Sequence, residues 1–181
     1  MKNTKISRPI IFVAVIAYII FAFIIFSLPD NPNNSKDKWN YLNSSEGHFK
    51  ILFPSHPQET LQNCESAKNC MTYTSTSTDG TQYTASFVEY NNTSYDTSQL
   101  NYNLINSVEL ASLNIGGQTI SSTRTTIRGY PAIKGTIKKT FGGYMKIQTI
   151  LIGHNLYVLS IYSKNNSFPY LNKYFDSFVK I

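Results

Sequence analysis

The sequence predicts an α+β domain in which helices sandwich an antiparallel β-sheet meander, preceded by one transmembrane helix. Residues 150–152 and 156–161 are apolar without alternation, so these strands require cover on both faces of the sheet. A helical spacing of apolar residues follows Thr97 and can supply part of that cover. An uncharged run near the start, residues 9–28, supplies the membrane segment.

The first element is the apolar run PIIFVAVIAYIIFAFIIFSL at residues 9–28. At about 1.5 Å per residue it spans about 30 Å, the hydrocarbon thickness of a bilayer. A cleaved secretory signal is the alternative, but its apolar region is shorter and ends at a small-x-small site. Bulky Phe26 and Leu28 occupy the exit instead. The pattern therefore favours an uncleaved anchor.

The flanking charges predict its orientation. Lys2, Lys5 and Arg8 precede the run, against Lys36 and Lys38 after it, so we expect residues 1–8 to be cytoplasmic. Residues 29–38 (PDNPNNSKDK) have the composition of a short linker. Residues 39–181 are then one extracytoplasmic domain, periplasmic or at the cell surface.

Charge excludes one functional class. The chain has a net charge of +6 with 16 basic and 10 acidic residues. Three of the basic residues precede the apolar run, so the remainder carries 13 minus 10, or +3. This balance, without a basic stripe or a recognisable module, argues against nucleic-acid binding.

Four strands are expected in the first half of the domain. The alternation at 48–53 predicts a strand ending at Pro54, and further strands are expected over 58–63 and 71–77. Asp79-Gly80 is typical of a hairpin turn, after which Tyr83, Ala85 and Phe87 alternate.

The two cysteines of the chain lie between the second and third of these strands. Cys64 and Cys70 form an even count suited to an oxidising compartment, and a local disulfide joining the two strand ends is the favoured interpretation. Two free thiols remain the alternative. The spacing is not CxxC and no second ligand pair exists, which argues against zinc.

The second half begins with the clearest helix outside the membrane run. Its apolar residues share one face, with Asp96 or Thr97 as cap and Gly116-Gly117 as stop: Leu100, Leu104, Val108, Ala111 and Ile115. Strands are then expected at 118–127, 131–140, 144–152 and 156–163, separated by glycine-containing turns. A C-terminal helix is expected over 170–179.

Several segments, in order, resemble the PsbP-like family, the fold of the extrinsic photosystem II subunit and of related bacterial domains. They are GHFKILFPSHP, the helix ending in Gly116-Gly117, GYPAIKG, GHNLYVLSIY and YFDSF, and together they cover roughly residues 47–178. The resemblance implies a fold, a sandwich of sheet and helices, more than a function. The family includes extrinsic subunits that bind membrane complexes, and related folds bind a small GTPase in nuclear import, a role that the predicted anchor argues against. The photosynthetic subunit's functional residues have no matching positions here.

No set of residues predicts catalysis, a metal or a cofactor. His48, His56 and His154 show no HExxH-type spacing. No GxSxG elbow accompanies the serines, and the acidic residues are scattered. A site between His48 and His56 lacks a third ligand.

The candidate site is a surface. Lys134, Lys138 and Lys146 should point the same way if strands 131–140 and 144–152 pair, forming a face for an acidic partner or for lipid headgroups. A solvated outer face is the plainer interpretation. We therefore expect a protein-binding or accessory module of a membrane complex. The alternative is an envelope enzyme or small-ligand-binding protein with a pocket between sheet and helix.

Overall fold

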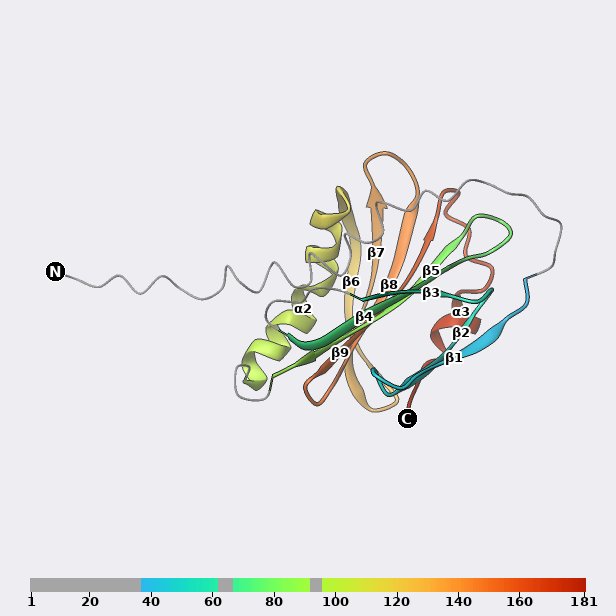
Figure 1. Cartoon of the computed structure of the whole chain (residues 1–181). Coiled ribbons are helices and arrows are strands. Elements are labelled where there is room, and N and C mark those ends of the chain that lie inside the picture. Colours follow the sequence, from blue (N-terminus) through green and yellow to red (C-terminus); the bar gives the residue numbers. More distant parts are fainter. Residues whose placement is uncertain (1–36, 62–66, 92–95) are drawn as a thin grey trace.

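A large antiparallel sheet forms the centre of the molecule. The computed structural model describes residues 37–61, 67–91 and 96–181. Seven strands pair in the order β3-β4-β5-β9-β8-β7-β6 (Figure 1). They are β3 (Gln58–Leu61), β4 (Ala67–Thr76), β5 (Gln82–Tyr90), β6 (Gly117–Ile127), β7 (Tyr130–Lys139), β8 (Tyr144–Ile152) and β9 (Asn155–Ser163). A smaller sheet of order β1-β2-β10 contains β1 (Asn40–Ser44), β2 (Phe49–Phe53) and β10 (Val179–Lys180).

The large sheet consists of two meanders. β3, β4 and β5 follow one another, as do β6 to β9, which confirms the expected run of antiparallel hairpins. The two halves join because β9 pairs with β5, with Gln82 opposite Tyr162. The turn after β4 contains Gly80 at φ +79°, the left-handed conformation expected for the Asp79-Gly80 hairpin.

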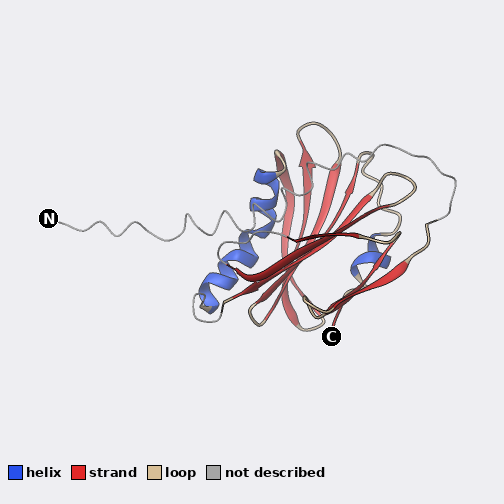
Figure 2. Ribbon diagram, viewed as in Figure 1, coloured by secondary structure: helices blue, strands red, loops and turns tan. Residues whose placement is uncertain are grey.

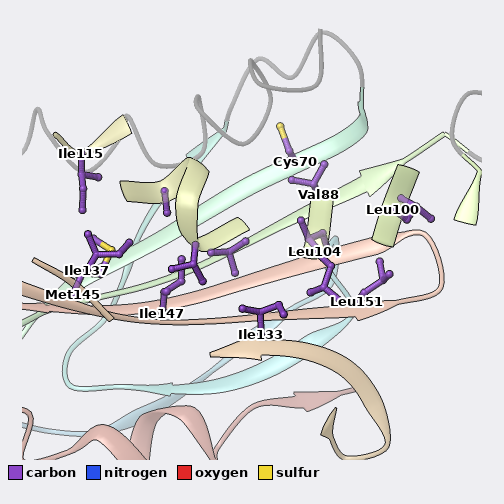
Figure 3. Packing of buried hydrophobic residues seen from close by; sticks show 14 of the residues in the cluster. Cys70, Val88, Leu100, Leu104, Ile115, Ile133, Ile137, Met145, Ile147 and Leu151 are labelled. Atoms are coloured by element: carbon purple, nitrogen blue, oxygen red, sulfur yellow. The ribbon is translucent and has the colours of Figure 1, made fainter. Parts of the chain in front are cut away.

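One face of the sheet is covered by α2 (Thr97–Asn114), as expected (Figure 2). Asp96 caps it, and Gln99 completes a capping box by accepting from the Asp96 N–H. Its buried side chains pack on β7 and β8, as Figure 3 shows for Leu104, Ile133 and Ile147. Gly135 lets α2 lie close to β7, because a Cβ at this position would lie 2.5 Å from a methyl carbon of Val108.

The opposite face is covered differently from the expectation. The prediction of helices on both faces is confirmed only in part on this side, because the short helix α3 (Leu171–Phe175) shares it with the small sheet (Figure 2). β2 faces the large sheet with three fully buried side chains, Phe49, Ile51 and Phe53. Tyr174 of α3 and the following Phe178 complete this second core cluster.

The expected C-terminal helix over 170–179 is too long. It ends at Phe175, and Val179–Lys180 instead pair with β2. Ser177 explains the change of path, because its hydroxyl oxygen accepts from the Leu52 N–H while the hydroxyl donates to the Tyr174 carbonyl. The chain leaves the helical path at Ser177, and the Phe178 side chain is buried in the second core cluster.

Two further boundaries differ. β1 was not expected, since NYLNS has no apolar alternation, and it forms through its pairing with β2. β4 begins at Ala67, four residues before the expected start, with a register shift between Ala67 and Asn69. The remaining strands lie within one or two residues of their predicted ranges over the part of the chain that is described.

Candidate functional site

The strand register brings the three predicted lysines to one face of the sheet. Lys134 and Lys138 lie four residues apart on β7, so they point to the same side. Lys146 of β8 is directly opposite Thr136, which lies between them. This is the face covered by α3, because the neighbouring position Ala132 belongs to the same core cluster as Tyr174.

A pocket of about 240 Å³ lies between strands β6 to β8 and α3. Two of the three lysines, Lys134 and Lys146, line it, whereas Lys138 does not. The remaining side chains include hydroxyl and amide groups, two apolar residues and one carboxylate: Ser121, Thr123, Thr136, Asn172, Leu171, Phe175 and Asp176. The pocket thus combines cationic, neutral polar and apolar surface.

Lys146 is held in place inside the pocket. Its Nζ donates to Thr136 Oγ1 at 2.9 Å and lies 5.7 Å from the centroid of the Phe168 ring. The ring contact and the hydroxyl together fix the direction of the ammonium group. Lys134 is exposed.

In the part of the chain that the structure describes, neither lysine of the pocket has a carboxylate partner. Within the described ranges, the only pair of opposite charges within 4 Å is Lys68–Glu89, at 2.7 Å. Asp176 contributes its backbone carbonyl to Arg128, 3.2 Å away, rather than its carboxylate to a lysine. The two ammonium groups and one carboxylate therefore leave the pocket with a net positive charge.

The chemistry of the pocket suits recognition of an anionic group. Ammonium and hydroxyl donors can hold a carboxylate through charge-assisted hydrogen bonds, while Leu171 and Phe175 contact the attached carbons. Pockets for drug-sized ligands are typically about 300–1,000 Å³, so this one fits a single side chain or a chain terminus better.

The histidines do not meet. His48 lies in the turn before β2 at φ +51°, His56 between β2 and β3, and His154 in the turn between β8 and β9. The His48 carbonyl accepts from the Ile181 N–H, and the His154 carbonyl accepts from the Tyr90 N–H. No cluster of three potential metal ligands occurs in the described part of the chain.

The predicted disulfide falls partly outside the described residues. Cys70 is buried in β4 at 3% exposure, on the face covered by α2. Cys64 lies in the segment that is not described, so its pairing with Cys70 stays a prediction that thiol labelling with and without reductant can test.

The predicted anchor, residues 9–28, is likewise outside the described residues. Of the helices in the ranges 37–61, 67–91 and 96–181, none has both the length and the hydropathy of a membrane span.

Sequence reasoning missed the α3 side of the pocket. Thr136 could have been found as the register partner of Lys146 once the strands were paired. Asn172 and Asp176 carry no such signal, because their position depends on where α3 packs.

Comparison with known proteins supports the fold. No protein-family model and no curated protein sequence matches this chain. Among solved structures, it is similar to the solution structure of cyanobacterial PsbP (CyanoP) from Synechocystis sp. PCC 6803, with a TM-score of 0.55. The match has 9% sequence identity and covers 87% of this chain and 99% of that one. The antiparallel sheet with its packing helix is therefore the PsbP-like fold.

Proposed function

We propose that this chain is a membrane-anchored accessory module that docks on a protein of a membrane complex and has no catalysis of its own. The single observation that carries the proposal is the pocket beside α3, where Lys134 and Lys146 line the wall without a carboxylate partner in the described chain. Its occupant in the proposal is an acidic side chain or the C-terminal carboxylate of the partner protein.

The two lysines can contribute strongly to the affinity for an acidic group of a partner protein. Hydrogen bonds to charged groups contribute about 1.5–3 kcal/mol each, so two ammonium donors can together raise the affinity about a hundredfold or more. Half-buried Leu171 and Phe175 add apolar contact next to them. The PsbP-like fold agrees with an extrinsic binding role.

The membrane location in this proposal is the one that the sequence predicts. Residues 9–28 anchor the chain in the bilayer, residues 1–8 remain cytoplasmic and the domain from residue 39 onward lies outside the cytoplasm. A short linker then keeps the pocket close to membrane proteins of the same envelope.

A small-ligand-binding role is the second candidate. The observation in its favour is that the pocket lies between the sheet and a helix, with polar groups on both walls. Its volume of about 240 Å³ is below the usual range for such ligands, about 300–1,000 Å³, which favours the docking role.

Site-specific photo-crosslinking of the full chain in its own membranes tests the proposal. A photoreactive amino acid at Asn172, on the rim of the pocket, should give one discrete adduct with a membrane or envelope protein. The matched control is the exposed Tyr102 on α2, on the opposite face, where no such adduct is expected. Absence of an adduct at Asn172, or equal adducts at both positions, contradicts docking at this pocket.

A further inference from the structure

The turn between β7 and β8 presents an exposed aromatic side chain. Phe141 is 98% exposed, the largest value among the large apolar residues of the described ranges. The turn is fixed by hydrogen bonds, since the Thr140 N–H donates to the Gly116 carbonyl and the Lys139 N–H to Gly143. Phe141 is therefore held outward by an ordered turn.

The polypeptide enters the domain at the same end of the sheet. The Asp37 carboxylate accepts from the Thr78 N–H at 2.8 Å, in the turn between β4 and β5. The register places Gln82 opposite Tyr162, and Tyr144 opposite Ser163, so the β4–β5 and β7–β8 turns share one end. Figure 1 shows the β7–β8 turn at the top of the view and the β6–β7 turn at the bottom.

The length of the linker relates this end to the bilayer. Eight residues, 29–36, separate the predicted anchor from Asp37 and reach at most about 26–29 Å. A nine-residue strand such as β8 is about 30 Å long. The linker thus keeps the entry end within about 26–29 Å of the predicted anchor, so turns at this end of the sheet can reach the bilayer surface.

The charges around Phe141 suit an anionic bilayer surface. Lys138 and Lys164 are exposed at this end, and Lys139 extends over the Tyr162 ring at 4.8 Å. Two carboxylates also lie at this end, and both accept hydrogen bonds from the β4–β5 turn: Asp37 from the Thr78 N–H, and Asp79 from the Ser77 hydroxyl and the Thr81 N–H. An aromatic ring flanked by lysines is typical of segments that enter the headgroup region.

We infer that the β7–β8 turn is a second membrane contact of this protein. Phe141 enters the boundary between headgroups and acyl chains, and Lys138, Lys139 and Lys164 contact lipid phosphates. The inference rests on the anchor of the proposed function. It assigns Lys138, the predicted lysine that lies outside the pocket, to lipid.

Tryptophan quenching by brominated lipid tests this contact. The full chain carries Trp39→Phe, which removes its one tryptophan, together with Phe141→Trp. It is reconstituted in vesicles of phosphatidylcholine and phosphatidylglycerol with or without brominated acyl chains. The matched control carries Tyr130→Trp, since Tyr130 begins β7 at the opposite end of the sheet and is 38% exposed. We expect quenching by about half for Phe141→Trp, as for a ring about 5–10 Å into the interface, and none for Tyr130→Trp.

The possible failures are distinguishable. If the chain floats with the vesicles but Phe141→Trp is unquenched, or both reporters are quenched equally, the contact by the turn is overturned and the anchor stands. If the chain does not float with the vesicles, the anchor is overturned and the inference with it.

Discussion

At the residue scale, two buried tyrosines of the same core cluster differ in their hydrogen bonding. The Tyr157 hydroxyl donates to the Gly47 carbonyl at 2.9 Å, which joins β9 to the turn before β2. The Tyr174 hydroxyl is fully buried and has no partner in the described chain. Burial raises the pKa of Tyr157 to about 12, so its hydroxyl remains a donor at physiological pH.

Removing each hydroxyl should therefore have different effects. Tyr157→Phe leaves the Gly47 carbonyl without its buried donor, and we expect a loss of about 1–3 kcal/mol in the free energy of unfolding. Tyr174→Phe removes a buried hydroxyl that makes no hydrogen bond, so we expect no loss or a small gain in stability. Urea denaturation of both variants in the full chain checks this, and equal losses would contradict the described contacts.

At the element scale, the start of α2 depends on one carboxylate. Asp96 accepts from the Gln99 N–H at 2.9 Å and from the Ser98 hydroxyl. The Ser98 hydrogen bond first, and then the Gln99 N–H, lower the pKa of Asp96 below its ordinary value of 3.8. A lowered pKa in the folded state means that the stabilisation is complete above about pH 4 and is lost as the pH falls further through the folded value.

The pH dependence of two variants separates the charge from the cap. We expect Asp96→Ala to lower the melting temperature at neutral pH, and the difference from the unmodified chain should shrink below about pH 4 as Asp96 is protonated. Asp96→Asn, which keeps an acceptor, should retain most of the melting temperature at neutral pH. A difference for Asp96→Ala that stays constant from neutral to acidic pH would show that the carboxylate does not cap the helix.

The elements differ in how far the sequence predicts them. α2 was predictable because its cap, apolar face and glycine stop all agree, and β8 and β9 because their unbroken apolar runs require two covered faces. β1 and β10 were not, since each forms by pairing with β2 and has no pattern of its own. α3 was predicted too long because the apolar spacing continues to Phe178, whereas the chain turns at Ser177.

At the scale of the whole molecule, the candidate site depends on packing between distant segments. Lys134 and Lys146 could be placed on one face from the expected strand pairing alone. The pocket itself arises where α3 lies against β6 to β8, so its apolar wall and Asp176 follow from tertiary structure. The sequence therefore predicted the charge of the surface but not its concave shape.

The two proposals give the molecule two separate functional surfaces. The pocket opens beside α3, midway along β7 and β8, and the β7–β8 turn lies at the end where the chain enters the domain. Contact of that turn with lipid leaves the pocket accessible to a neighbouring membrane protein. Lys134 and Lys138, four residues apart on one strand, would then serve different partners.

The most direct test of docking at the pocket compares these lysines in partner recovery. The full chain is crosslinked in its own membranes and purified, and the yield of the co-purified partner is measured for Lys134→Ala combined with Lys146→Ala, and for Lys138→Ala as the matched control. We predict at least a tenfold loss of the partner for the double variant, because each charged hydrogen bond contributes about 1.5–3 kcal/mol, and close to full recovery for Lys138→Ala. Full recovery with the double variant, or an equal loss with Lys138→Ala, would contradict the assignment of the pocket as the docking site.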